Sequence, residues 1–138
     1  MAQIMAVDFG KKRCGIAATD DMQIIASAVD TVETAKIFKF FKDYFQLNKV
    51  EAIVVGLPID LKGNMNEIET EISIFVKNFQ TEYPEIIVHR LEERFTSKMA
   101  SYYISQSGKG KKKRQEKGLI DRVSATIILQ NFLEQKQR

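Results

Sequence analysis

The chain has 138 residues, of which 44% are hydrophobic and 28% charged, and its formal net charge is +3. This length fits a single domain over residues 1–138 with a substantial core, and the composition is ordinary for a soluble globular protein. No apolar run approaches the ~18–20 residues of a membrane helix, no secretory signal is visible, and a lone cysteine excludes an internal disulfide. We therefore expect a cytoplasmic protein that does not span a membrane.

The first part of the chain predicts three strands followed by a helix. Apolar runs at residues 3–9, 14–19 and 24–29 are joined by short segments, so we expect an antiparallel meander with a turn at residues 10–13. Residues 35–45 then change to a helical period, and one face of this helix carries Ile37, Phe38, Phe41, Tyr44 and Phe45. This stripe is expected to be core rather than a platform for stacking bases.

The rest of the chain alternates strands and helices. The nearly continuous apolar run at 50–58 is typical of a strand buried on both faces. A second helix, with Asn66 as its expected cap, has an apolar stripe of Ile68, Ile72, Phe75 and Phe79. A strand at 85–93, a helix at 97–107 and a final helix at 119–136 follow. The only histidine, His89, is expected to pack rather than to act in catalysis.

The resulting order is βββαβαβα. A meander followed by strand–helix alternation predicts an α/β fold. We expect a mixed five-stranded sheet, with three antiparallel strands and then parallel ones, and helices on both faces.

Acidic residues from distant parts of the sequence are expected to meet at one edge of this sheet. Asp8 ends the first strand, Glu92 and Glu93 end the last strand, and Asp121 heads the apolar stripe of the final helix. Ligands of such sheets bind at the carboxyl ends of the parallel strands. Clustered carboxylates suit hard cations such as Mg²⁺ or Mn²⁺, and two ions about 4 Å apart support phosphodiester cleavage.

Each acid also has a structural interpretation. Asp8 could accept hydrogen bonds in the turn that follows it, and Asp121 suits the first turn of a helix because of the helix dipole. Glu92 and Glu93 could pair with the flanking Arg90 and Arg94. The stretch DFGKKRCG could instead cradle a phosphate, although it is neither a Walker loop nor a GxGxxG motif. The residues alone leave these alternatives open.

A concentrated basic block precedes the final helix. Residues 109–118 carry a net charge of +5, whereas the whole chain carries +3, so the remainder is mildly acidic at −2. Such a block is either a solvated loop or a contact for polyanions such as RNA and DNA.

Four blocks in order, DFGKKRCGIA, VVGLPIDLKGN, EERFTS and IDRVSATIIL, resemble the YqgF/RuvX family of Holliday-junction resolvases, also called pre-16S rRNA nucleases. Together they span essentially the whole chain. The resemblance implies a ribonuclease H-like fold. It also implies a nuclease site in which Asp8, Glu93 and Asp121 are catalytic and hold the metal, with two Mg²⁺ or Mn²⁺ ions expected.

The resemblance further implies nucleic-acid contacts from Lys12, Arg13, Arg94, Lys111, Lys112, Lys113 and Arg114. Arginine can bind a backbone phosphate through two parallel hydrogen bonds, and clustered lysines attract polyanions without sequence preference. Thr96 is either the cap of the helix at 97–107, a role that Ser97 could also fill, or an additional site residue.

The chain departs from the family pattern at three positions. Glu92 stands where aspartate is usual, so the principal metal ligand is either Glu92 or Glu93. Lys62 precedes Gly63 where the family usually has Asp-Gly, and Ser124 stands where alanine is common.

We expect a metal-dependent endonuclease that acts on structured RNA and processes the 5′ end of pre-16S rRNA in ribosome biogenesis; the substrate follows from the resemblance alone. One alternative is a Holliday-junction resolvase acting on branched DNA, which needs a dimer to cut two strands symmetrically. Another is a non-catalytic RNA-binding assembly factor. The sequence is compatible with a monomer or a homodimer.

Overall fold

The computed structural model of the protein describes residues 2–57, 67–92 and 117–136, with side chains in the last range from Val123 onward. Five strands form one sheet in the order β3-β2-β1-β4-β5. They are β1 (Gln3–Asp8), β2 (Arg13–Thr19), β3 (Ala26–Glu33), β4 (Val50–Leu57) and β5 (Ile87–Glu92). The first three strands are antiparallel, β4 is parallel to β1, and β5 is parallel to β4. The predicted mixed sheet is therefore confirmed.

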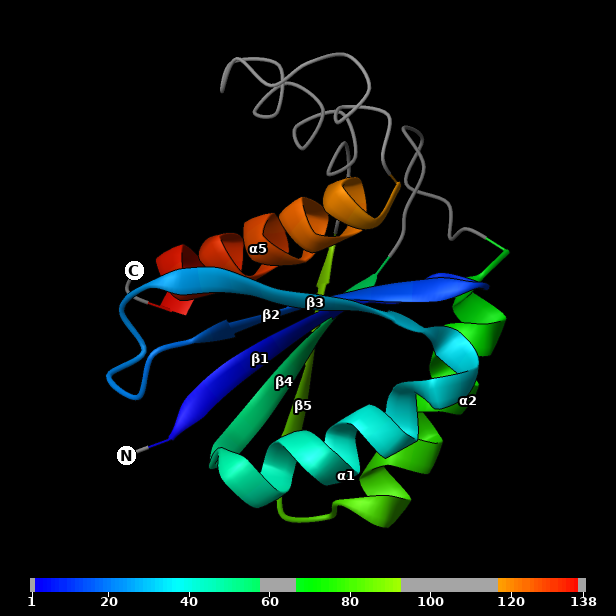
Figure 1. Ribbon diagram of the computed structural model, residues 1–138, viewed down its shortest axis with the longest axis horizontal. Coiled ribbons are helices and arrows are strands. Elements are labelled where there is room, and N and C mark those ends of the chain that lie inside the picture. Colours follow the sequence, from blue (N-terminus) through cyan, green and yellow to red (C-terminus); the bar gives the residue numbers. More distant parts are fainter. Residues whose placement is uncertain (1, 58–66, 93–116, 137–138) are drawn as a thin grey trace.

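The helices cover both faces of this sheet, as the sequence predicts (Figure 1). The short 3₁₀ helix η1 (Thr34–Lys36) leads into α1 (Ile37–Leu47), which lies with α2 (Glu69–Glu82) on one face. The opposite face carries α5 (Lys117–Lys136), mainly over β1, β2 and β3. The expected helix at 97–107 and the expected cap Asn66 lie outside the described residues.

Each central strand contributes to two cores because successive side chains of a strand point to opposite faces. In β1, Met5 and Val7 pack with α1 and α2, whereas Ile4 and Ala6 pack with α5. This two-sided burial explains why β1 and β4 have nearly continuous apolar sequences.

The aromatic stripe of α1 is core, as expected. Phe41 is fully buried, and its ring lies 5.5 Å from that of Phe45 and 5.1 Å from that of Phe79 in α2.

The third strand begins at Ala26, two residues later than predicted. Ile24 and Ile25 are each 63% exposed and belong to the turn between β2 and β3. The cause is Asp20, whose carboxylate accepts hydrogen bonds from the main-chain N–H groups of Ile24 (2.9 Å) and Ile25 (2.8 Å). These bonds hold the pKa of the Asp20 carboxyl below its usual value. The turn chemistry of one aspartate therefore overrides the strand preference of two isoleucines.

The third strand also ends at Glu33, four residues later than predicted, whereas the remaining boundaries differ by one or two residues, which is usual for the ends of elements. The strand predicted at 85–93 begins at Ile87, and the final helix begins at Lys117 rather than at residue 119.

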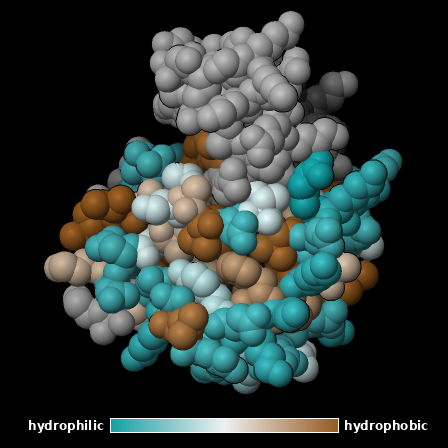
Figure 2. All heavy atoms as spheres, in the orientation of Figure 1, coloured by the Kyte–Doolittle hydropathy of each residue, from teal (hydrophilic) through white to brown (hydrophobic). Residues whose placement is uncertain are grey.

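Polar residues cover much of the face shown in Figure 2, with apolar residues in small groups among them. In the described part of the chain, the exposed large apolar side chains are Met22, Ile24, Ile25, Val29, Leu47, Ile74 and Ile87. Among the described residues, none of the helices has the length and apolar character needed to cross a membrane.

Candidate active site

Asp8 is the last residue of β1, and its side chain is partly buried. Its main chain pairs with Gly15 of β2, while the preceding Val7 pairs with Val55 of β4. Because Ile4 and Ala6 face α5, the alternation of the strand places Asp8 on that same face. The candidate carboxylate therefore stands at the end of a central strand, on the face covered by α5.

The carboxyl ends of three parallel strands meet beside Asp8. Strand β4 lies between β1 and β5, and its Gly56 and Leu57 pair with Leu91 and Glu92 of β5. The pairing of Val7 with Val55 puts Asp8 level with Gly56. The predicted edge of the sheet therefore exists, and β1 and β5 end within about one residue of each other along it.

Glu92 lies on the opposite face of the sheet from Asp8. The preceding residue, Leu91, packs with α5, and Arg90, two residues before Glu92, reaches α2. Alternation along β5 therefore directs Glu92 to the α2 side. The structure does not bring Glu92 and Asp8 together on one face.

Arg90 pairs with Glu69 at the start of α2, a partner that sequence reasoning missed. Arginine Nη2 lies 2.5 Å from Oε1 of Glu69, and Nη1 lies 3.1 Å from Oε2. The same guanidinium donates to the main-chain oxygens of Val55 (3.2 Å) and Gly56 (3.1 Å). The hydrogen bonds from Arg90 lower the pKa of the Glu69 carboxyl. The pair joins the carboxyl end of β4 to the start of α2, next to the candidate site.

The turn between β1 and β2 lies at the same edge as Asp8. Lys12 in this turn is exposed, and Arg13, which begins β2, is partly buried and pairs across the ladder with Glu33. Gly10 is needed for the tight path of the turn, because a Cβ atom there would lie 2.5 Å from the main-chain oxygen of Arg13. Two of the predicted nucleic-acid contacts are thus close along the chain to Asp8.

The remaining predicted site residues lie outside the described part of the chain: Glu93, Arg94, Thr96, Lys111, Lys112, Lys113 and Arg114. Asp121 falls within α5, one helical turn before the buried Ala125, but its side chain is also outside that part. Among the described side chains, no three acidic, histidine or cysteine residues are grouped so that they could hold a metal ion. The three-carboxylate metal cluster stays a prediction.

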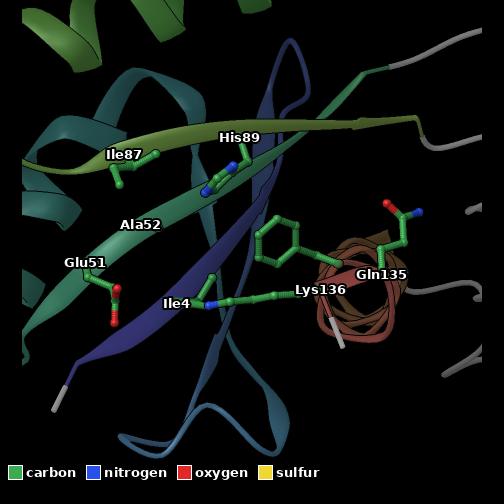
Figure 3. Close-up of a pocket in the computed structure, with 8 residues that line it drawn as sticks. Ile4, Glu51, Ala52, Ile87, His89, Gln135 and Lys136 are labelled. Atoms are coloured by element: carbon green, nitrogen blue, oxygen red, sulfur yellow. The ribbon is translucent and has the colours of Figure 1, made fainter. Parts of the chain in front are cut away.

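A hollow of ≈ 410 Å³ lies at the other end of the sheet, where β1, β4 and β5 begin and α5 ends (Figure 3). Its lining residues are Ile4, Glu51, Ala52, Ile87, His89, Phe132, Gln135 and Lys136. The His89 ring packs against Phe132 with 4.9 Å between ring centroids, which confirms the expected packed histidine. This hollow is separate from the edge that carries Asp8.

The model of one protein family, described as "RuvX: Holliday junction resolvase", matches residues 2–135 of the chain. A relative from Flavobacterium johnsoniae, named "Putative pre-16S rRNA nuclease", is 48% identical over 137 residues, covering 99% of this chain and 99% of its own. Relatives of the same name from Christiangramia forsetii and Bacteroides fragilis are 46% and 42% identical. They cover 96% and 99% of this chain, and 98% and 99% of their own lengths.

Among solved structures, the chain is similar in fold to RuvC of Thermus thermophilus in complex with a Holliday junction substrate. The TM-score is 0.59 at 13% sequence identity, covering 99% of this chain and 96% of that one. A second structure of RuvC from Thermus thermophilus gives a TM-score of 0.55 at 13% sequence identity, over 98% of this chain and 96% of its own. The expected ribonuclease H-like fold is confirmed by these similarities. The family match over residues 2–135 and the relatives at 42–48% identity show that the chain belongs to the RuvX family.

Proposed function

We propose that this protein is a nuclease that hydrolyses phosphodiester bonds of structured RNA and matures the 5′ end of pre-16S rRNA in the cytoplasm. Membership of the RuvX family and relatives named as pre-16S rRNA nucleases support this activity. The structural observation that carries it is the place of Asp8. A carboxylate that ends a central strand, level with the ends of β4 and β5, stands where α/β sheets bind their ligands.

We assign the metal-binding role to Asp8, Glu93 and Asp121, with Mg²⁺ or Mn²⁺ as the cofactor and two ions in the site. Carboxylate oxygens are the donors that these cations prefer, so the acids fit the group. Such ions would activate water and neutralise charge on the phosphate during cleavage.

We choose Glu93 over Glu92 because Glu92 lies on the face opposite Asp8. The helical position of Asp121, four residues before the buried Ala125, supports its inclusion in the same cluster.

The basic residues supply the affinity for the nucleic-acid backbone in this proposal. Lys12 and Arg13 lie in and beside the turn that follows Asp8, and Arg94 follows Glu93 in the sequence. The basic residues Lys111, Lys112, Lys113 and Arg114 add attraction that does not depend on base sequence.

The decisive experiment compares Asp8→Asn with the unchanged protein on a pre-16S rRNA fragment and on a four-way DNA junction, with Mg²⁺ or Mn²⁺ present. We expect cleavage of the RNA alone, lost in Asp8→Asn while binding of the RNA is kept. Asp21→Asn is the matched control, because Asp21 is an exposed acid in the turn between β2 and β3, at the other end of β2.

Other outcomes of the same experiment select other functions. Selective cutting of the junction would favour the resolvase, an activity that the family description names and that needs a homodimer rather than a monomer. Binding without cleavage of either substrate would favour a non-catalytic assembly factor. Cleavage that survives Asp8→Asn would refute the site assignment.

A further inference from the structure

We propose that Thr34 is a positioning residue that holds the turn between β1 and β2 in the shape that binds a backbone phosphate beside Asp8. This inference rests on the proposed nucleic-acid substrate and adds a residue that lies far from the turn in the sequence. It concerns residues 10–12 and the start of η1.

Thr34 is hydrogen-bonded to the turn through its main-chain N–H and its side-chain hydroxyl. Its main-chain N–H donates to the main-chain oxygen of Lys12 at 3.0 Å, and its hydroxyl donates to that of Gly10 at 2.6 Å. The Sγ atom of Cys14 lies 3.5 Å from the Thr34 hydroxyl oxygen, and because the single hydroxyl proton goes to Gly10, the thiol is the donor. One residue of η1 thus holds the turn at both of its ends, with its side chain at Gly10 and its main chain at Lys12.

These bonds occupy the carbonyl oxygens of Gly10 and Lys12 and leave main-chain N–H donors for a ligand. Among the residues that the structure describes, none accepts a hydrogen bond from the main-chain N–H of Lys11 or Lys12. The side chains of both lysines are exposed. Successive free N–H groups beside lysine side chains form the kind of concavity that binds a phosphate.

Fixing the turn in advance strengthens binding because the ligand then does not have to order it. The backbone at Gly10 already has little room, with the Arg13 oxygen 2.5 Å from where a Cβ would stand. Without the Thr34 hydroxyl, Gly10 would lose its bond to η1, and Lys12 would bind phosphate from a less ordered turn.

The test is a double-mutant cycle between Thr34→Val and Lys12→Gln, measured as RNA binding in the Asp8→Asn background so that no cleavage occurs. Valine keeps the branched shape and the main-chain N–H of Thr34 but removes the hydroxyl. We expect Thr34→Val to raise the Kd for RNA about fivefold, the size of one lost phosphate contact. It should also reduce the magnitude of the salt-dependence slope by about 0.7–0.9. Both changes, in Kd and in the salt-dependence slope, should nearly vanish when Thr34→Val is made in a protein that already carries Lys12→Gln.

Two variants separate positioning from loss of stability. Thr34→Ser restores a hydroxyl and should restore binding. Thr81→Val removes another threonine hydroxyl, which donates to the main-chain oxygen of Lys77 at 3.0 Å within α2, and should leave binding unchanged. In the active protein, Thr34→Val should raise KM while changing kcat little.

Additive effects of Thr34→Val and Lys12→Gln would overturn the proposal, as would unchanged binding in Thr34→Val. If Thr34→Val does not fold, Gly10→Ala disturbs the same turn and should show the same dependence on Lys12. An unchanged protein that binds no nucleic acid would instead refute the proposed function, so the two failures are distinguishable.

Discussion

The ion pair between Arg90 and Glu69 predicts a loss of stability that depends on pH. In Glu69→Gln the side chain keeps its shape but loses its charge, and with it the charge-assisted bonds to Arg90. Such bonds contribute about 1.5–3 kcal/mol when desolvated. The two side chains are 25% and 13% exposed, and glutamine retains one acceptor, so we expect a loss of about 1–2 kcal/mol at neutral pH.

The sign of the pH effect follows from the pKa of Glu69, which is lower in the folded state than its ordinary value of 4.5. The ionised carboxylate therefore stabilises the fold above that ordinary value, and this contribution disappears as the pH falls through the lowered folded-state pKa. Below that ordinary value the difference in stability between Glu69→Gln and the unchanged protein should shrink as the pH falls, because protonation progressively makes Glu69 neutral as well.

Urea unfolding at neutral pH and at about pH 3 measures this difference directly. Glu71→Gln is the matched control, since Glu71 is the other acid in the first turn of α2 and is exposed. Both variants lose the same favourable interaction with the helix dipole, but only Glu69→Gln loses the arginine. An equal loss in the two variants, or a loss that does not change with pH, would refute the role assigned to the pair.

Two further predictions concern Ser124 and the basic block. Ser124 is 1% exposed and its hydroxyl oxygen has no hydrogen-bond partner among the described residues, so Ser124→Ala should raise the free energy of unfolding by about 1 kcal/mol. Thermal or urea unfolding checks this, and a clear loss of stability would contradict it. Replacing Lys111, Lys112, Lys113 and Arg114 by glutamine should weaken RNA binding and reduce the magnitude of its salt-dependence slope by up to about 3. A slope unchanged from that of the unreplaced protein in a salt titration would leave the block without its proposed role.

The sheet and the helices that cover it could be predicted because burial and periodicity agree along most of the chain. β1 and β4 are buried on both faces, and α1 buries one aromatic stripe. Their apolar patterns therefore identify two buried strands and an amphipathic helix. The predicted start of β3 was wrong because the Asp20 carboxylate accepts hydrogen bonds from the main chain of the following turn. The apolar side chains of residues 24 and 25 favour a strand, but these hydrogen bonds hold both residues in the turn.

The candidate site could be predicted only where one element determines a residue's place. Asp8 follows from the end of β1, and the alternation of Leu91 and Glu92 along β5 already contains the signal that Glu92 turns away from Asp8. The pairing of Arg90 with Glu69, 21 residues away, could not be found because it depends on how α2 docks against the sheet. The contact between Thr34 and Gly10, across 24 residues, has the same cause.

The position of β1 in the sheet also bears on how often each part of the molecule opens. β1 is hydrogen-bonded to β2 on one side and to β4 on the other, and both of its faces are covered. We therefore expect its amide protons to exchange with solvent only when most of the fold comes apart, and those of β3, at the edge, to exchange through small local openings. Since Asp8 ends this central strand, we expect the main chain that carries its carboxylate to stay in place during local openings of the edge strand.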